Sequence, residues 1–459
     1  PPPSVLKGER RADERKAVMR LLPLPLALAL ALGSCGDTAR LGVQAGTGPA
    51  PVLPKPVKST IPTVKVADAT GWPAGQMPVA APGLRVQAFA EGLDHPRWLH
   101  VLPNGDVLVA ETASPGTDKS GKGTIKGFFM KMFMKKAGSA VPSANRISLL
   151  RDANQDGVAE MRTVLVDGLY SPFGMALLGD QLFVANADAL VRFPFRPGMI
   201  RITAAPVKVT DLAGGWNHHW TKSLVASPDG RWLFVGVGSN SNVGENGMAM
   251  ERGRAAIWRI DPRTGASQIF ASGLRNPVGI AFNPWSGALW TAVNERDELG
   301  SDLVPDYITS VREGGFYGWP YSYFGQRVDS RIKPPRPHLV ARAIVPDYAM
   351  GPHVAALGLT FSQGQRLGPQ FAQGAFVGEH GSWNRNPPSG YKVVFVPFGG
   401  ARPSGMPVDV LVGFLRDGKA FGRPVGVEIA RDGSLLVADD VGNKVWRVSA
   451  ALPPRVVRR

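Results

Sequence analysis

One hairpin-like unit recurs six times between residues 95 and 440, and this repetition limits the folds that the chain can adopt. Each copy has a short apolar strand, a turn with Gly or Asp, and a second apolar strand, as in RPVGVEIARDGSLLVADD from Arg423. Turns such as Pro-Asn-Gly and Arg-Asp-Gly between β-branched runs are typical of β-hairpins. The copies begin at His95, Ser171, His219, Arg275, His353 and Arg423.

The spacing of the copies predicts how they assemble. Third and fourth strands follow several copies, and a four-stranded unit repeated at intervals of about 50 to 80 residues is typical of a β-propeller. We therefore predict an all-β fold, a six-bladed β-propeller with four-stranded antiparallel blades, rather than unrelated hairpins in a β-sandwich. The Pro-x-Gly that recurs at the start of the first strand, as at Pro277/Gly279 and Pro424/Gly426, favours the repeat.

A propeller brings two sets of positions to one mouth of its central channel. These are the residues just before each first strand and those just after each second strand. The first set includes Arg97, His219, Arg275, Asn276, His353 and Arg423, and the second includes Glu111, Asn186, Glu295, His380 and Asp440. Both sets are rich in Arg, His and carboxylates, and function in such folds lies in loops on a rigid scaffold. We expect a polar site at this mouth.

Composition excludes some classes of site. The 459 residues include one cysteine, which permits no intrachain disulfide and no cysteine-based zinc site. The formal net charge of +16 favours solubility, an anionic ligand or an anionic membrane surface. No nucleic-acid-binding motif and no dense basic stripe is found, so we expect no nucleic-acid partner.

The N-terminal region predicts export. Residues 21 to 32 read LLPLPLALALAL after Arg20, and a basic flank, a short apolar run and small residues indicate a signal peptide over residues 1–35. Leu32-Gly33-Ser34-Cys35 resembles a bacterial lipobox, in which the cysteine is lipidated; an ordinary signal peptide with an incidental cysteine is the alternative. Residues 36–80 are predicted to be a flexible linker, and residues 81–453 the propeller. We expect a periplasmic protein, anchored to the membrane if Cys35 is lipidated.

Four long blocks resemble a known family. They are WNHHWTKSLVASPDG, GLRNPVGIAFNP, NERDELGSDLVPDYITSVREGGFYGWPYSYFG and GEHGSWNRNPPSGYKVV. In this order they resemble the soluble quinoprotein glucose/sorbosone dehydrogenases, over roughly residues 85 to 450, and more the sorbosone branch. The resemblance implies a six-bladed propeller that binds pyrroloquinoline quinone (PQQ) with calcium at the channel mouth and oxidises a sugar, sugar aldehyde or related alcohol. Leu169 stands where the glucose enzymes have a glutamine, so the substrate pocket differs from theirs.

The resemblance assigns roles to individual residues. His219 matches the catalytic base, and histidine suits this role because its pKa lies near neutral pH. Arg275 and Asn276 match a pair that contacts the cofactor, and a guanidinium group suits the three carboxylates of PQQ. The further candidates for cofactor binding are His380, Arg385, Lys392 and Arg423.

Two segments are candidates for calcium, which prefers oxygen ligands. In the family, backbone carbonyls of the loop after the fourth copy's second strand hold the ion, and here these belong to Asp297 and Glu298. A second, acidic loop with Asp152, Asn154, Asp156 and Glu160 is spaced like the start of an EF-hand, although its glutamate comes too early. We predict a second calcium there, with a solvated turn as the alternative.

Two other functions remain open at this point. A calcium-dependent lactonase would also be a six-bladed propeller, but it needs a carboxylate-rich metal site on the axis. A non-catalytic propeller that serves as a binding platform would keep the repeats without a cationic ring. If the chain is a dehydrogenase, its electrons must pass to a separate acceptor, because it has no Cys-x-x-Cys-His haem motif.

Overall fold

The computed structural model describes residues 36–57, 63–116, 132–215 and 218–451. The signal peptide predicted for residues 1–35, with Cys35, lies outside these ranges. Strands dominate the described residues, with the short α-helix α3 (Pro337–Ala341), a helical stretch at residues 132–136, and the 3-10 turns η1 (Val43–Gly46), η2 (Met248–Glu251) and η3 (Pro369–Phe371). No helix in the described part of the chain is long and apolar enough to cross a membrane.

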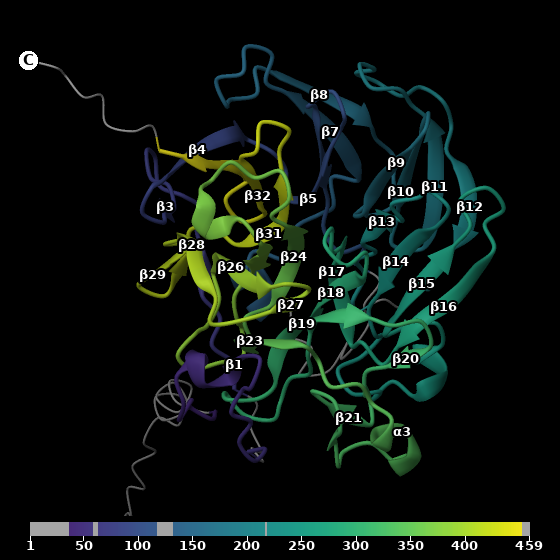
Figure 1. The fold of residues 1–459 in the computed structure, drawn as a ribbon, viewed down its shortest axis with the longest axis vertical. Coiled ribbons are helices and arrows are strands. Elements are labelled where there is room, and N and C mark those ends of the chain that lie inside the picture. Colours follow the sequence, from purple (N-terminus) through teal and green to yellow (C-terminus); the bar gives the residue numbers. More distant parts are fainter. Residues whose placement is uncertain (1–35, 58–62, 117–131, 216–217, 452–459) are drawn as a thin grey trace, which may run out of the picture.

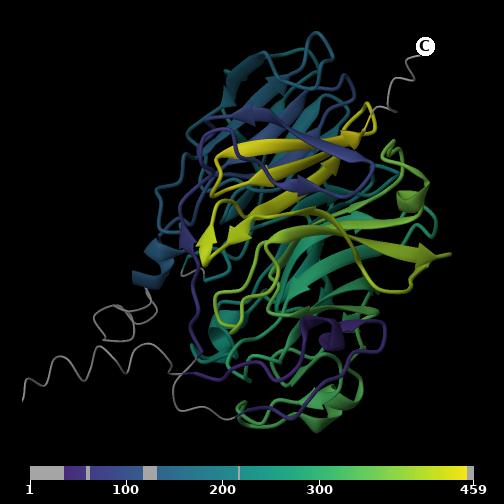
Figure 2. The same ribbon diagram turned by 90° about the vertical axis from the view of Figure 1, so that its left-hand side faces the viewer.

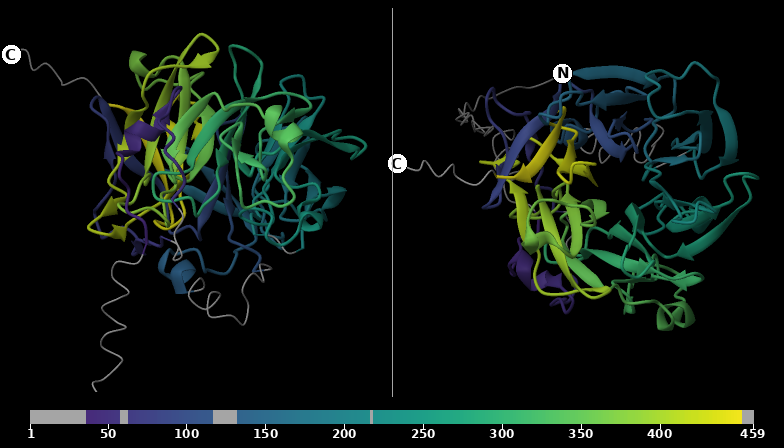
Figure 3. Two further views of the ribbon diagram at one scale, coloured as in Figure 1. Left: turned by 90° about the horizontal axis from the view of Figure 1, so that it is seen from below. Right: turned by 45° about the horizontal axis from the view of Figure 1, so that its top comes forward.

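Six sheets in the described residues contain at least four strands each, and Figure 3 shows them in chain order around a common axis. The first sheet contains β5 (Pro96–Val101), β6 (Val107–Glu111), β7 (Arg146–Arg151) and β8 (Met161–Val166). The second contains β9 (Met175–Leu178), β10 (Gln181–Ala185), β11 (Ala189–Pro194) and β12 (Val207–Asp211). The third contains β13 (Leu224–Ala226), β14 (Leu233–Val237), β15 (Ala256–Ile260) and β16 (Ser267–Ser272), with β20 (Gly315–Phe316) parallel to β16.

The other three large sheets continue the series (Figure 1). The fourth contains β17 (Asn276–Phe282), β18 (Leu289–Asn294), β19 (Pro305–Val311), β23 (Tyr348–Pro352) and β1 (Thr47–Gly48). The fifth contains β24 (Ala356–Phe361), β25 (Gly374–Glu379), β26 (Lys392–Gly399), β28 (Val408–Val412) and β3 (Val79–Ala80), and β27 (Arg402–Pro403) pairs with β26. The sixth contains β31 (Pro424–Ile429), β32 (Leu435–Asp439), β33 (Lys444–Ala450) and β4 (Leu84–Glu91). Small additions are β2 (Asp68–Ala69) with β29 (Leu415–Arg416) and β30 (Lys419–Ala420), and the pair β21 (Ser322–Tyr323) and β22 (Arg327–Val328).

The sheets form a closed, propeller-like ring. The innermost strands β5, β9, β13, β17, β24 and β31 contact one another in chain order, and β31 returns to β5. The N-terminal strand β4 completes the last sheet by pairing with β33, so that the two ends of the described repeat region close the ring. On the axis, the packed side chains are those of Trp98, Phe173, Trp220, Val278, Leu357 and Val425. This apolar core holds the inner strands in fixed positions.

The glycine of the recurring Pro-x-Gly allows neighbouring inner strands to approach closely. A Cβ at Gly279 would lie 2.5 Å from the carbonyl oxygen of Leu357 on β24. A Cβ at Gly426 would lie 2.8 Å from the carbonyl oxygen of Arg97 on β5. The repeated glycine is therefore a packing requirement of the ring.

The described parts of residues 36–80 differ from the flexible linker that their composition predicts. The amides of Arg40 and Leu41 donate to Asp302, and the amide and hydroxyl of Ser301 donate to the side chain and carbonyl of Asp37. Further along, β3 pairs with β28. Figure 2 shows this N-terminal segment, in purple, lying along the sheets. A Pro- and Ala-rich composition does not prevent an extended segment from being fixed by backbone hydrogen bonds.

Candidate functional site

His219 and Arg275 lie side by side at the mouth where the inner strands begin. The Nδ1 atom of His219 lies 2.9 Å from the carbonyl oxygen of Ser239, and the amide of Ser239 donates to the carbonyl oxygen of Arg275. A Cβ added at Gly238 would meet both the Oδ1 atom of Asn276 and the Cβ atom of His219, at 2.4 and 2.5 Å. The third and fourth copies of the repeat thus bring together the three residues His219, Arg275 and Asn276.

Hydrogen bonds determine the tautomer of His219. The Ser239 hydroxyl donates its proton to the carbonyl oxygen of Ser241 at 2.6 Å, so the Ser239 carbonyl must accept a proton from Nδ1 of His219. The Nε2 atom then carries a lone pair, and it has no hydrogen-bond partner among the described residues. Burial, together with the nearby charge of Arg275, holds the pKa of His219 well below its ordinary value of 6.5. The imidazole is therefore neutral at neutral pH and can accept a proton at Nε2.

The guanidinium group of Arg275 is saturated by the protein. Its Nε atom donates to the carbonyl oxygen of Asn242, and its Nη1 atom donates to the carbonyl oxygens of Asn294 and Glu295. Its Nη2 atom donates to the side chains of Asn242 and Asp297 at 2.9 and 3.1 Å. All five N–H groups are used, so Arg275 contributes positive charge and fixes the surrounding loops.

Asn276, next to Arg275, differs from it in having a free acceptor. It is 7% exposed, and its Oδ1 atom is buried with no hydrogen-bond partner among the described residues. An orphaned buried acceptor costs free energy unless a bound molecule donates to it. Asn276 is therefore a candidate contact for a bound molecule.

Asp440 organises the other half of the mouth. The Nη1 atom of Arg97 donates to Asp440 at 2.6 Å, the Nε2 atom of His380 lies 2.9 Å from the same carboxylate, and His95 lies 3.6 Å away. Burial favours the neutral acid, but His380, His95 and Arg97 outweigh it and hold the pKa of Asp440 below its ordinary value. Burial lowers the pKa of His380 to about 4, so its neutral imidazole donates to an ionised Asp440.

Two arginines of this half keep unused donors. Arg423 donates from Nη2 to the hydroxyl of Tyr391, but its Nε atom is buried without a partner among the described residues, as is the Nε atom of Arg97. Burial lowers the pKa of Arg97, and the nearby positive charge of Arg423 lowers it further. The guanidinium carbon of Arg97 lies 5.8 Å from the ring of Trp220, the neighbour of His219. Trp220 thus joins the two halves into one site.

The sequence matches the family described as TrAA12-like over residues 143–308 and 340–451, which is more than half of the chain. The chain belongs to the TrAA12-like family.

This TrAA12-like protein is similar to individual relatives in sequence and to solved structures in fold. Aldose sugar dehydrogenase YliI of Escherichia coli (strain K12) is 33% identical over 175 residues, which are 35% of this chain and 45% of that protein. The holo form of the pyranose dehydrogenase PQQ domain from Coprinopsis cinerea has a TM-score of 0.64 at 20% identity, covering 84% of this chain and 100% of that domain. The calcium structure of a Trichoderma reesei family AA12 enzyme has a TM-score of 0.65 at 18% identity, covering 82% and 97%. The chain spans about half the length of the curated relatives that it matches first.

Two predicted cofactor residues of the TrAA12-like chain have polar partners in the protein, although the Nε atom of Arg385 is buried without a partner among the described residues. Arg385 donates to the carbonyl oxygens of Pro387 and Leu41, and so it fixes the N-terminal segment. Lys392, on β26, donates to the half-exposed Asp409 at 2.7 Å. Their roles in cofactor binding stay predictions. His380 and Arg423 do lie in the cluster.

The carbonyl of Asp297 is also engaged. It accepts hydrogen bonds from both the Nε and Nη2 atoms of Arg296, at 3.0 and 2.7 Å, which use its two lone pairs. Its side chain accepts from Arg275 and Asn384. Glu298 pairs through its side chain with Arg331. The backbone oxygen of Asp297 is therefore poorly prepared for calcium.

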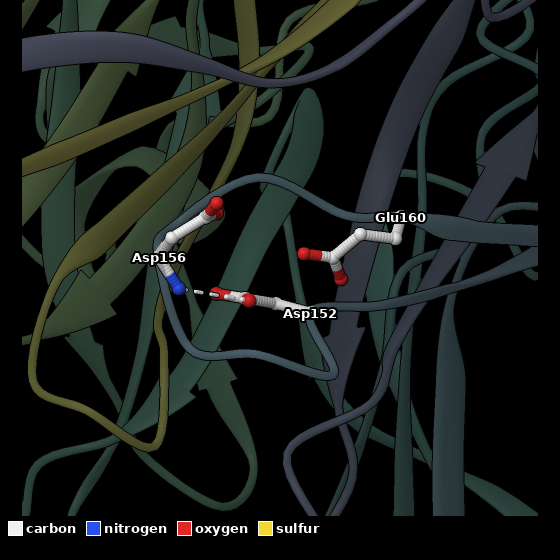
Figure 4. Close-up of side chains that lie close together, drawn as sticks. All are labelled: Asp152, Asp156 and Glu160. Carbon is white, nitrogen blue, oxygen red and sulfur yellow. Dashed lines mark hydrogen bonds between the residues drawn. The ribbon is translucent and has the colours of Figure 1, made fainter.

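The acidic loop between β7 and β8 does bring carboxylates together. Ligand oxygens of Asp152, Asp156 and Glu160 lie within 4.8 Å of one another, and Figure 4 shows them facing a common space. Asn154 instead donates to Asp156 at 3.2 Å. Backbone amides already donate to all three carboxylates. The second calcium stays a prediction.

Ser239 and Asn242 are site residues that the sequence did not single out. They follow β14, the second strand of the third copy, in the segment Gly238-Ser239-Asn240-Ser241-Asn242. This is the repeat-equivalent position of Glu295 and Asp440 in other copies, so alignment of the copies could have found it.

Proposed function

We propose that this chain oxidises a sugar, or a related alcohol or aldehyde, with PQQ and calcium at the mouth formed by His219, Asn276 and the Asp440 cluster. The observation that carries the proposal is a neutral imidazole with an open Nε2, beside Asn276 and a group of buried guanidinium ions. Membership in the TrAA12-like family, and relatives described as PQQ-dependent or as a calcium structure, support the activity and both cofactors.

The residues present fit PQQ. It is a tricarboxylate, and the mouth offers unsatisfied guanidinium N–H groups on Arg97 and Arg423. Arg275 adds positive charge without a free donor, and Asn276 adds a free acceptor. Arg97 and Arg423 would hold the carboxylates, while Arg275 would act through the loops that it fixes. When bound, PQQ supplies a quinone carbon that accepts hydride.

His219 would act as general base. The substrate hydroxyl would give its proton to Nε2 while Nδ1–H stays bonded to the Ser239 carbonyl, which stabilises the imidazolium that forms. The low pKa of His219 keeps it unprotonated before reaction. Bound carboxylates near this imidazole would raise its pKa toward the working pH, which strengthens the base.

Calcium fits less well where the sequence places it. Because the two lone pairs of the Asp297 carbonyl are used by Arg296, an ion there would have to displace a guanidinium group. We therefore derive no step through calcium. The lactonase alternative requires carboxylates on the axis, but the axis in the described residues is filled by apolar side chains such as Phe173 and Val278.

The finer architecture and location belong to the same proposal. Each of the six large sheets would be one propeller blade, with residues 81–453 as the catalytic domain. The chain would be exported to the periplasm, with Cys35 as a lipid anchor and a separate protein as electron acceptor. The leader sequence and the absence of a haem motif support these points.

Reconstitution tests the proposal. Purified protein is incubated with PQQ and calcium, and reduction of an artificial dye is followed with aldoses, sorbosone and simple alcohols. We expect dye reduction that requires both PQQ and one class of these substrates. Saturable PQQ binding without oxidation of any substrate, or no PQQ binding, would contradict the proposal.

A further inference from the structure

A cavity lies at the C-terminal ends of three inner strands, and the mouth lies at the N-terminal ends of the same strands. The cavity has a volume of about 390 Å³, opens to solvent, and is lined at the ends of β17, β24 and β31. β17 runs from Asn276 at the mouth to Phe282 at the cavity. Six steps along a strand span roughly 20 Å, so the cavity is a separate place on the opposite face of the ring.

The cavity contains polar groups without protein partners. Glu428 is half-buried, and its carboxyl group has no hydrogen-bond or ion-pair partner among the described residues. Thr360 is 9% exposed, and no hydrogen bond of its hydroxyl group is found in the described part of the chain. Both groups face the cavity and are accessible to a bound molecule.

The charge state of Glu428 narrows the chemistry of a ligand. Burial raises the pKa of this carboxyl to about 8, which favours at neutral pH the uncharged form that both donates and accepts. Arg431 also lines the cavity, but it donates to the carbonyl oxygen of Pro103. Arg431 would repel a positively charged ligand. An anion would meet a guanidinium group that already donates to Pro103.

The remaining lining suits a ligand with hydroxyl groups and apolar faces. Gln363 provides a carboxamide at the rim, and Phe282, Phe361 and Pro284 provide apolar surface. A few placed polar groups among apolar side chains, in a space of about 300 Å³ or more, are typical of small-molecule sites. The volume accommodates one or two sugar rings.

We propose that this cavity binds a neutral saccharide, through Glu428 and Thr360, at a site distinct from the mouth. The bound sugar is either a free sugar or a unit of a longer chain, and both offer the same hydroxyl groups. The proposal extends the proposed function but does not depend on it, because binding here requires neither cofactor nor turnover.

Calorimetric titration of cofactor-free protein tests this site. Glucose, cellobiose and cellotetraose are titrated into wild type and into Glu428→Leu, Thr360→Val and Glu428→Gln. We expect Glu428→Leu and Thr360→Val each to weaken binding at least about fivefold, since each removes hydrogen bonds to the sugar. Glu428→Gln keeps a neutral hydrogen-bonding group and should bind within about twofold of wild type. Tighter binding of cellotetraose than of glucose would indicate a chain segment, and equal binding a free sugar.

Controls separate this site from the mouth and from folding. Arg231→Ala, in the exposed β13–β14 turn, should bind sugar as wild type does. Dye-coupled oxidation should be unchanged in Glu428→Leu. Thermal unfolding of each variant shows whether it is folded. The proposal is overturned if no sugar binds, if Glu428→Leu and Thr360→Val bind as wild type, or if spermidine binds in place of the sugars and loses affinity in Glu428→Gln.

Discussion

The two halves of the mouth use charge in different ways. Around His219, all N–H groups of Arg275 donate to the protein. The groups left open there are the Nε2 atom of His219 and the Oδ1 atom of Asn276. Around Asp440, one buried carboxylate collects Arg97, His95 and His380, and the open groups are guanidinium N–H donors. Under the proposed function, the first half would serve proton transfer, and the second would hold an anion.

This difference assigns separate effects to substitutions in each half. Changes at Asp440 should act on stability, changes at Arg97 on cofactor affinity and stability, and changes at His219 on the chemical step. The halves would not be distinct if a substitution changed one of these three properties other than those expected for it.

The largest effect is expected for Asp440→Asn. The substitution leaves Arg97 buried without a counter-charge, which typically costs about 3–5 kcal/mol in the free energy of unfolding. Denaturant unfolding measures the loss. Asp409→Asn, which affects the half-exposed pair with Lys392, is the matched control and should cost less than about 1 kcal/mol. Equal losses in both variants would contradict the central place of Asp440.

Arg97→Gln should weaken cofactor binding in addition to breaking the buried pair with Asp440. Losing charge-assisted hydrogen bonds to a carboxylate of PQQ should raise its dissociation constant roughly tenfold to hundredfold. Absorbance titration with PQQ measures the change. Lys392→Gln removes a positive charge outside the mouth and should leave the constant unchanged. If Lys392→Gln has the larger effect, the carboxylates bind elsewhere.

The pH dependence sharpens the role of His219. Its folded pKa is depressed, so the free enzyme keeps a neutral base above that pKa and loses it as pH falls through it. We expect the acid limb of kcat/KM, measured with PQQ-loaded protein, to follow the pKa of His219 and to vanish from the residual rate of His219→Gln. An acid limb that persists in the variant would belong to another group.

The smallest effect concerns the acidic loop, outside both halves. If Asp152, Asp156 and Glu160 bind calcium, millimolar calcium should raise the Tm by roughly 2 °C relative to a chelator, because the ion binds only the folded chain. Calorimetry of wild type and Asp156→Asn measures this shift, which should disappear in the variant. An unchanged shift in Asp156→Asn would place the stabilising ion at another site.

Much of the fold could be predicted because each copy of the repeat has the same pattern of strands and turns. The positions of His219, Arg275, Asn276, His380 and Arg423 followed from repeat equivalence and family resemblance. Individual hydrogen bonds could not be predicted. The saturation of Arg275, the capture of Arg385 by the N-terminal segment and the pairing of Lys392 with Asp409 depend on loops from distant parts of the chain. For the same reason, the linker prediction for residues 36–80 missed the contacts with Ser301 and Asp302.

His219→Gln in PQQ-loaded protein tests the central claim most directly. Loading is first confirmed by absorbance titration, and dye-coupled oxidation of the preferred substrate is then measured at saturation. A missing general base should lower kcat by about a hundredfold to ten-thousandfold, with PQQ affinity within a few fold of wild type. Dye reduction at the wild-type rate would contradict the assignment of His219 and the function proposed for this mouth.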